Sequence, residues 1–277
     1  MRGILAGALA VACLLEPMAF GERPLIEIWP MDPLIKVFPD ATPDSNGKAL
    51  AEVARGEHAT LQIVVRSDVD LSDLRVSVTP LKRRLGSGGL LPRAPRIVGY
   101  VSVNRPIQKP PKDQLRKPPA DYPDPLLEVS SLDVPAGRAQ AVWITVPVTV
   151  DAAPGRYHGK LIVSAGISGK EFIVKQPLAV KVYPAMVRST RLWVTEWFGL
   201  NTAHLAIHPA PDSEEFYELL RRYARNMAEH RHNVALISPI GLADFTVTAE
   251  GALDIDFARF DRWVNIFKEE GVIGRIE

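Results

Sequence analysis

Residues 140–163, QAVWITVPVTVDAAPGRYHGKLIV, decide the fold class of the first part of the chain. Every second residue near their start is apolar: Val142, Ile144, Val146 and Val148. This period of two is typical of a β-strand with one face in a core. Pro154-Gly155 then predicts a turn, and Leu161 and Val163 predict the inward face of a following strand.

The same alternation recurs on both sides of this stretch. In HATLQIVVRS, residues 58–67, apolar residues alternate with polar ones, which predicts a half-buried strand. Another strand is predicted where Leu178, Val180 and Val182 share a face. Short strands at this spacing, without long helical patterns between them, are typical of an antiparallel β-sandwich. We expect this sandwich to occupy residues 22–187.

A proline- and lysine-rich segment, PIQKPPKDQLRKPPADYPDP, interrupts these strands at residues 106–125. It is either an arm that binds anions or docks a partner, or a solvated connection stiffened by proline. Residues 22–187 show no metal-ligand spacing, glycine-rich phosphate loop or nucleophile elbow. The sequence therefore predicts no cofactor and no catalytic group in this part.

Length and charge narrow the classes of function. At 277 residues the chain exceeds the usual single-domain size, which favours two domains. Its 33 Lys and Arg against 32 Asp and Glu leave a net charge of +1, so no overall basic excess attracts a phosphate backbone. We therefore expect no nucleic-acid partner.

Residues 1–21, MRGILAGALAVACLLEPMAFG, predict a signal peptide. Arg2 supplies a positive start, an apolar run follows, and residues 19–21 form a small-x-small cleavage site. The run is shorter than the ~20 residues that cross a bilayer, so we expect no integral membrane span and a secreted or periplasmic protein. Cys13, the only cysteine, lies in a poor lipoprotein site, which makes lipid anchoring the weaker alternative.

After about residue 187 the pattern changes to alternating strands and helices. LWVTEWF (192–198), NVALISP (233–239) and VIGRIE (272–277) predict short apolar strands. A helix with Asp212 as its N-cap is predicted between the first two strands, from an apolar stripe of Phe216, Leu219, Leu220, Tyr223, Ala224 and Met227. DFARFDRWVNIFKEEG (256–271) predicts a second helix that ends before Gly271. The intervening DFTVTAEGALDID predicts a hairpin around Glu250-Gly251.

Strand, helix, strand, helix, strand is the βα repeat of a parallel sheet. No glycine-rich phosphate turn follows the first strand, which argues against a doubly wound fold. A (β/α)8 barrel needs ~250 residues, so residues 188–277 hold only its opening units. The predicted fold class is therefore multi-domain: an N-terminal antiparallel β-sandwich followed by the first βα units of a truncated (β/α)8 TIM-type barrel.

Four stretches of the first part together resemble glycoside hydrolase family 123. GEHATLQIVVRS (56–67), GYVSVNRP (99–106), DYPDPLLEV (121–129) and residues 140–163 occur in the order and approximate spacing of that family's N-terminal β-sandwich. The resemblance implies that the sandwich precedes a glycosidase barrel, of which residues 188–277 are an N-terminal fragment. It also implies a glycan substrate that contains N-acetylhexosamine.

The mechanism implied by the resemblance is substrate-assisted. In the family, the acetamido group of the sugar attacks, and an adjacent Asp-Glu pair on a later barrel strand orients it and supplies the acid. No such pair occurs in the 277 residues, so we name no catalytic residue and expect the chain by itself to be inactive.

Candidate substrate-binding residues follow from where barrel active sites lie, at the C-terminal ends of the strands. Glu196 and Trp197 end the first predicted strand, and Ser238 ends the second. An aromatic ring there can stack on a sugar, and a carboxylate can accept hydrogen bonds from its hydroxyls. The alternative is that Trp197 packs in a core and Glu196 is a solvent-facing or ion-paired strand end.

Four histidines, His204, His208, His230 and His232, invite a metal hypothesis. An i, i+2 spacing does not bring side chains together on a helix, and basic residues in a last helical turn are favoured by the helix dipole. We therefore predict no metal site. Asn233 is either a left-handed helix terminator or a polar group at the N-terminal end of the second strand.

Two functions of different class remain open at this point. The first is an exported glycoside hydrolase, truncated in its barrel. The second is a non-catalytic surface module that binds carbohydrate or protein. The coding sequence downstream discriminates them, because the enzyme needs further βα units with an Asp-Glu pair at a strand end.

Overall fold

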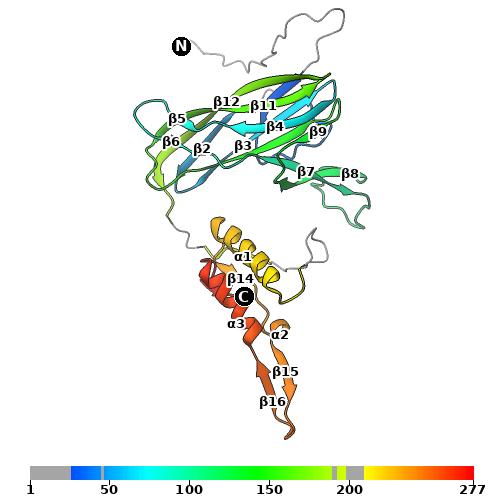
Figure 1. Ribbon diagram of the computed structural model, residues 1–277, viewed down its shortest axis with the longest axis vertical. Helices are drawn as coiled ribbons and strands as arrows, with labels where there is room; N and C mark the ends of the chain where they lie inside the picture. The colour runs from blue at the N-terminus through cyan, green and yellow to red at the C-terminus, as the bar shows by residue number, and fades with distance from the viewer. Residues whose placement is uncertain (1–25, 45–46, 189–191, 198–208) are drawn as a thin grey trace, which may run out of the picture. The chain divides into compact units, whose positions relative to one another are not determined.

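The computed structural model describes residues 26–44, 47–188, 192–197 and 209–277. The chain divides into two compact units, with the boundary between Arg188 and Ser189 (Figure 1). The predicted signal peptide, residues 1–21, lies outside the described residues and stays a prediction. Among the described residues, no helix is long and apolar enough to span a membrane.

One sheet of the first unit has five strands in the order β1-β3-β10-β7-β8, and every neighbouring pair is antiparallel. Its strands are β1 (Ile26–Met31), β3 (His58–Ser67), β10 (Gln140–Pro147), β7 (Arg96–Val103) and β8 (Ala120–Leu127). The predicted strand at residues 58–67 is therefore confirmed as β3. It pairs with β10 so that Ile63 lies opposite Val142.

The other sheet has seven strands, with the order β2-β12-β11-β4-β9; a short strand β5 also pairs with β11, and β6 pairs with β5. Its strands are β2 (Leu50–Arg55), β12 (Lys170–Met186), β11 (Gly155–Ile167), β4 (Leu71–Val78), β9 (Leu132–Val134), β5 (Leu81–Arg83) and β6 (Gly89–Leu90). The sandwich is confirmed, with one correction: β2 and β12 run parallel. Strands this far apart in sequence are not joined by a hairpin, so chain connectivity does not force them to be antiparallel.

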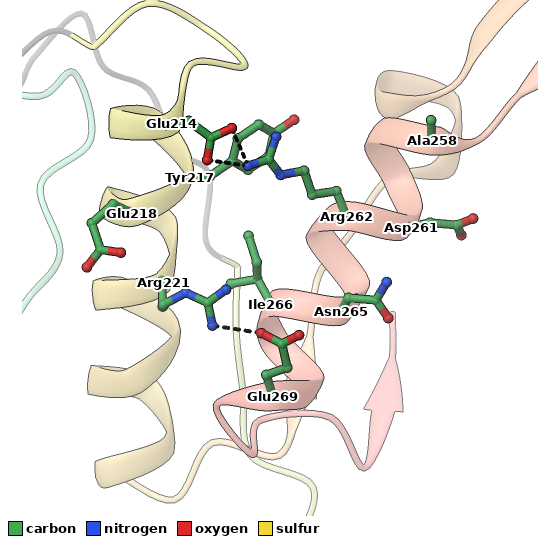
Figure 2. Close-up of a pocket in the computed structure, with 10 residues that line it drawn as sticks. All are labelled: Glu214, Tyr217, Glu218, Arg221, Ala258, Asp261, Arg262, Asn265, Ile266 and Glu269. Atoms are coloured by element: carbon green, nitrogen blue, oxygen red, sulfur yellow. Dashed lines mark hydrogen bonds and ion pairs between the residues drawn. The ribbon is translucent and has the colours of Figure 1, made fainter.

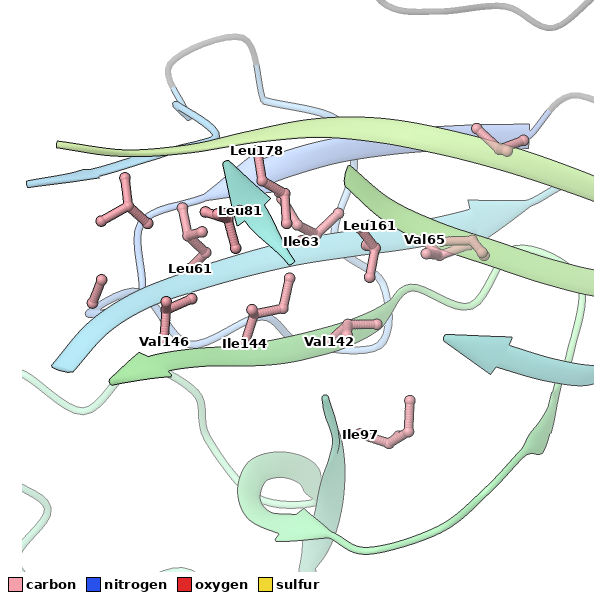
Figure 3. Close-up of a cluster of buried hydrophobic side chains, with 14 of the residues drawn as sticks. Leu61, Ile63, Val65, Leu81, Ile97, Val142, Ile144, Val146, Leu161 and Leu178 are labelled. Atoms are coloured by element: carbon pink, nitrogen blue, oxygen red, sulfur yellow. The ribbon is translucent and has the colours of Figure 1, made fainter. Parts of the chain in front are cut away.

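The main core lies between the two sheets, and Figure 3 shows its side chains meeting there. Alternate residues of β3 and β10 supply one side, and β11 and β12 supply the other. Residues 140–163 therefore cross from one sheet to the other, because β10 and β11 belong to different sheets. Burying one Leu or Ile side chain completely stabilises the folded state by about 1.5–3 kcal/mol, so this core dominates the stability of the unit.

The second face of β3 is also buried, which the sequence pattern did not predict. Val64 is completely buried in a smaller cluster with Trp29, Val37 and Val98. The segment after β1 covers this face, and the Gln62 side-chain amide donates to the carbonyl oxygens of residues 32 and 35, both at 3.0 Å. Gln62 is thus a satisfied buried polar group instead of a solvated one.

The second unit contains a three-stranded sheet in the order β13-β14-β17. The strands are β13 (Thr195–Glu196), β14 (Val234–Ala235) and β17 (Arg275–Ile276), and both pairs are parallel. Its helices are α1 (Glu214–Glu229), α2 (Pro239–Leu242) and α3 (Ala258–Glu269). The predicted parallel βα repeat is confirmed. Three short strands do not by themselves establish a barrel.

The start of α1 differs from the prediction. Ser213 is the N-cap, and its hydroxyl oxygen accepts from the Phe216 N–H at 3.2 Å. Asp212 has a φ of +62° and instead accepts a hydrogen bond from the Tyr217 hydroxyl at 2.8 Å. That contact helps to bury Tyr217, whereas Tyr223 of the predicted stripe is only half-buried.

Two other predicted features of this unit are confirmed. The hairpin consists of β15 (Asp244–Val247) and β16 (Leu253–Asp256), with Gly251 at a φ of +81° in its turn. Gly271 follows the end of α3 with a φ of +86°, the left-handed conformation typical of a residue just past a helix.

Candidate functional site

The two faces of the three-stranded sheet have different surroundings. Ala235 and Ile237 pack into a core with Leu220 of α1 and Phe267 of α3, so the helices cover that face. Side chains of successive strand residues point to opposite faces. The row that contains Thr195, Val234 and Arg275 therefore faces away from the helices.

We call this second face the open face and define it by Thr195, Trp197, Arg275 and Glu277. The Thr195 hydroxyl donates to the Glu277 carboxylate at 3.0 Å, across the intervening strand β14. Trp197 follows two residues after Thr195 and is 80% exposed. The open face thus offers a carboxylate, a guanidinium, a hydroxyl and an indole ring, which are groups that bind polar ligands.

The predicted site residues do not share one face. Glu196 pairs with Ala235, so its side chain lies on the helix side, where its carboxylate is 3.9 Å from Nε2 of His232. Trp197 belongs to the open face. The ion-paired alternative for Glu196 matches this geometry, and the roles of both residues in substrate binding stay predictions.

Ser238 lies at the end of β14 and has a local structural role. It is the N-cap of α2, and its hydroxyl oxygen accepts from the Gly241 N–H at 3.1 Å. The residue is exposed, and its hydroxyl hydrogen is still available to a ligand. Its predicted contact with substrate stays a prediction.

Asn233 connects the strands of the sheet at their N-terminal ends. Its amide oxygen accepts from the Val194 N–H at 2.8 Å, and its amide nitrogen donates to the Leu192 carbonyl at 2.9 Å. Its own carbonyl accepts from the Gly274 N–H at 2.8 Å. One residue thus connects all three strands. The left-handed position belongs to Arg231, with a φ of +64°, so Asn233 is the polar group at the strand's N-terminal end.

Trp193 also lies at the N-terminal end of the sheet, just before β13. Trp197, on the open face, lies at the C-terminal end. The Arg275 guanidinium is 4.7 Å from the centre of its ring. A Cβ added at Gly274 would lie 3.0 Å from the ring and 3.1 Å from the Asn233 carbonyl oxygen, so only glycine fits without a shift. Trp193 is 55% exposed, and its contacts with Arg275 and Gly274 give it a local structural role.

The histidines do not form a metal site in the part of the chain that the structure describes. His230 makes a hydrogen bond through Nδ1 to the Asn226 carbonyl at 2.8 Å, and His232 faces Glu196. No three His, Cys, Asp or Glu side chains converge among the described residues. His204 and His208 lie outside them.

A cavity of about 580 Å³ lies between α1 and α3 (Figure 2). Glu214 binds Arg262 at 2.7 Å across it, and Arg221 binds Glu269 at 2.8 Å. The Arg262 guanidinium stacks 3.5 Å above the ring of Tyr217. These pairs join the outer surfaces of the two helices, so this cavity has a structural explanation and is separate from the open face.

A second set of ion pairs closes the far end of the same helix pair. Arg225 binds both carboxylate oxygens of Glu270 at 3.1 Å, and Arg221 reaches Glu270 at 3.3 Å. The hydrogen bond from Arg225 holds the pKa of Glu270 below its usual value. Arg225 and Arg221 therefore extend the charged form of this carboxylate to lower pH.

Thr195, Arg275 and Glu277 were not predicted from the sequence as site residues. The signal was present in VIGRIE, residues 272–277, because alternation along the predicted strand puts Arg275 and Glu277 on one face. The hydrogen bond from Thr195 to Glu277 depends on the order β13-β14-β17, which the sequence does not contain.

The comparisons with known proteins match the sandwich best. The family model of the glycoside hydrolase 123 N-terminal domain matches residues 39–165. A search of curated proteins finds no sequence match. The matched residues contain all four stretches on which the sequence resemblance rests, and most of the strands of both sheets.

Among solved structures, the chain is similar to a family 123 glycoside hydrolase from Clostridium perfringens, analysed for glycolipid glycan hydrolysis. The identity is 13% and the TM-score 0.57, with 81% of this chain covered. The chain spans 41% of the length of that enzyme. A likeness to the CooA pilin subunit from enterotoxigenic Escherichia coli covers 53% of this chain and 100% of the pilin at 13% identity, and its TM-score of 0.28 carries no argument.

Proposed function

We propose that this chain, a glycoside hydrolase family 123-like protein, is the N-terminal part of an exported enzyme that cleaves glycans containing N-acetylhexosamine. In this proposal β13, β14 and β17 are the first strands of a (β/α)8 barrel that follows the sandwich. The observation that supports it is the parallel sheet with both helices on one face, in a chain of which 81% aligns with the Clostridium enzyme.

The open face becomes the inner face of the barrel in this proposal. Side chains on the inner face pack in layers, and those at the C-terminal strand ends reach the substrate. Trp197 is placed to stack on a sugar, with Ser238 as a hydrogen-bonding neighbour at the next strand end. The acetamido group of the sugar supplies the nucleophile, and the Asp-Glu pair that orients it comes from residues beyond this chain.

Hydrolysis tests the catalytic part of the proposal. The purified chain is expected to leave an aryl N-acetylhexosaminide uncleaved, because it lacks the acid pair. A longer product of the same gene, with the remaining βα units, is expected to cleave it. Turnover by the present chain, or none by the longer product, would contradict the proposal.

Sugar binding tests the site itself. In the longer product, Trp197→Ala is expected to raise KM for the same substrate by roughly tenfold, because it removes an aromatic platform worth on the order of 1–2 kcal/mol. Trp193→Ala is the matched control, since that ring precedes β13, beside Arg275, whereas Trp197 follows it. Equal effects of the two substitutions on KM would remove Trp197 from the site.

Export has its own test. If the signal peptide is cleaved after Gly21, the protein recovered from the periplasm or medium begins at Glu22. Mass spectrometry of its N-terminal peptide checks this. A protein that keeps residues 1–21 would contradict the export proposal, and a lipid on Cys13 would favour the anchored alternative.

A second candidate function is a non-catalytic carbohydrate-binding module. The observation in its favour is that no adjacent Asp-Glu pair occurs in the sequence. The downstream coding sequence separates the candidates: an Asp-Glu pair at the end of a later strand supports the enzyme, and a barrel without the pair supports the module.

A further inference from the structure

The connection between β7 and β8, residues 104–119, concentrates positive charge. We call it the basic loop. Its charged residues are Arg105, Lys109, Lys112, Asp113, Arg116 and Lys117. Five cations against one carboxylate give a net charge of +4, whereas the whole chain carries +1. The remainder of the protein is therefore net negative, and the basic loop is a local exception.

Four of these cations are exposed and available. Arg105, Lys109, Lys112 and Lys117 are exposed and make no ion pair in the described part of the chain. Two carboxylates near the base of the loop bind cations outside it, in the pairs Asp124–Lys36 and Glu128–Arg96, and Asp40 binds the loop's own Arg116. Ion pairs with neighbouring residues thus neutralise Arg116 and leave the charge of the other four cations in place.

The base of the loop is held in one conformation by Arg116 and Tyr122. The Arg116 N–H donates to the Tyr122 hydroxyl oxygen at 3.0 Å, and that hydroxyl donates back to the Arg116 carbonyl at 2.5 Å. The Arg116 guanidinium lies 3.9 Å from the centre of the Phe38 ring and 2.6 Å from the Asp40 carboxylate. A loop fixed in this way loses less conformational entropy on binding.

Proline also limits the conformations of the loop. Its five prolines are Pro106, Pro110, Pro111, Pro118 and Pro119. Each fixes φ near −65°, which restricts the unbound loop. Figure 1 shows the loop continuing past the ends of β7 and β8. Exposed, restricted and unneutralised ammonium groups are the features of an anion-binding surface.

We propose that the basic loop binds an anionic polysaccharide, bearing sulfate or carboxylate groups, through Lys109, Lys112 and Lys117. The choice of a polysaccharide among polyanions rests on the proposed function, because a glycan hydrolase gains from an additional contact with its polymer. A flexible glycan can follow a single loop, whereas a rigid duplex would also meet the net negative remainder of the protein.

The test measures binding of the full chain to chondroitin sulfate and to its chemically desulfated, carboxyl-reduced counterpart, at about 50 mM and about 300 mM salt. Binding of the sulfated polymer is expected at low salt and is expected to weaken at high salt, while the neutral polymer does not bind. No binding of the sulfated polymer at low salt would overturn the proposal.

Two triple variants identify the site. Lys109→Ala, Lys112→Ala and Lys117→Ala together are expected to weaken binding by roughly tenfold or more, because each cation near an anionic surface raises the affinity severalfold. Lys82→Ala, Lys160→Ala and Lys175→Ala remove the same charge from exposed strand positions and are the matched control. Equal weakening by both variants would overturn the assignment to the loop.

A charge-conserving variant and a second probe complete the test. Arginine at positions 109, 112 and 117 is expected to retain binding, which separates loss of charge from loss of fold. Ile107 and Leu115 in the loop are 58% and 62% exposed, so vesicles of phosphatidylglycerol are the competing probe. Tighter binding to these vesicles than to chondroitin sulfate would overturn the polysaccharide. A barrel without activity that still binds the polymer would refute only the proposed hydrolysis.

Discussion

The two units of the chain bury their sheets differently. The sandwich covers the inner faces of both its sheets, and its five-stranded sheet is buried on the second face as well. The sheet of the second unit is covered by α1 and α3 on one face, while Thr195, Arg275 and Glu277 on the other face are exposed. Apolar burial therefore stabilises the sandwich, whereas polar contacts contribute a larger share of the stability of the second unit.

This difference suggests where each unit is sensitive to substitution. Truncating a side chain in a close-packed core leaves a cavity that lowers stability. The stability of the sandwich is therefore expected to depend most on the volume of its buried side chains. The second unit depends on single side chains that connect separate elements, Asn233 across the three strands and Glu270 between two helices. It is expected to respond most to lost hydrogen bonds.

The largest expected effect comes from Leu161→Ala in the sandwich. Leu161 is fully buried between the sheets, so its truncation is expected to lower the free energy of unfolding of this unit by about 2–5 kcal/mol. Hydrogen exchange measured by mass spectrometry reports each unit separately. Ile173→Ala, at a position of β12 that is 54% exposed, is the control and is expected to change stability by less than about 0.5 kcal/mol. Increased exchange in the second unit alone would contradict the comparison.

The next effect is expected from Asn233→Ala in the second unit. The substitution removes the side-chain acceptor of the Val194 N–H and one donor to the Leu192 carbonyl, at a cost of about 1–3 kcal/mol. Faster exchange of the Val194 amide is the specific readout. Asn265→Ala, on the exposed surface of α3, serves as the control. An unchanged exchange rate of the Val194 amide would show that the Asn233 side chain does not stabilise this end of the sheet.

A smaller effect, confined to high pH, is expected from Tyr100→Phe in the sandwich. Burial raises the pKa of Tyr100 to about 12, whereas an unfolded tyrosine titrates near 10. The native state therefore holds its proton more tightly, so the free energy of unfolding falls as pH rises from about 10 to about 12. After allowance for partial exposure, this amounts to about 1–2 kcal/mol. Urea unfolding at pH 9 to 12 measures it.

Tyr100→Phe is expected to lack this fall, so the stability difference between the two proteins should shrink as pH rises. At neutral pH the variant loses only the hydrogen bond that the hydroxyl donates to the Ala139 carbonyl at 3.0 Å. A difference that stays constant through pH 12 would mean that Tyr100 is not protected from solvent.

The smallest effect is expected from Glu270→Gln, which weakens the link between α1 and α3 by about 1 kcal/mol or less at pH 7. The pKa of Glu270 is lowered in the folded protein, so its contribution is present above the unfolded pKa and is lost as pH falls through the folded pKa. Thermal unfolding from pH 7 downward should show the full difference at pH 7 and its progressive loss as pH falls below the unfolded pKa of glutamate. Glu218→Gln on α1 is the matched control, and an equal effect from it would contradict the specific link.

The sequence predicted those parts of the fold that depend on periodicity. Alternation predicted β3, β10 and β12, and the helical stripe predicted α1. It did not predict that Gln62 and Val64 would be buried, because the covering segment after β1 has no regular pattern. It also did not predict the parallel pairing of β2 with β12, which depends on long-range order in the sheet.

The sequence predicted less of the candidate site than of the fold. Glu196, Trp197 and Ser238 were all predicted from their positions at strand ends. The register puts Glu196 beside His232, and the order of strands brings Thr195 to Glu277. Both facts depend on pairing between segments about forty to eighty residues apart.

The most direct measurement is a crystal structure of the protein that includes the residues encoded after Glu277. The account predicts that further parallel strands follow β17 and close a barrel, with Thr195 and Glu277 inside it and an Asp-Glu pair at a later strand end. It would be contradicted by β13 hydrogen-bonded into the sandwich sheets, or by an open face covered with helices as in a doubly wound sheet.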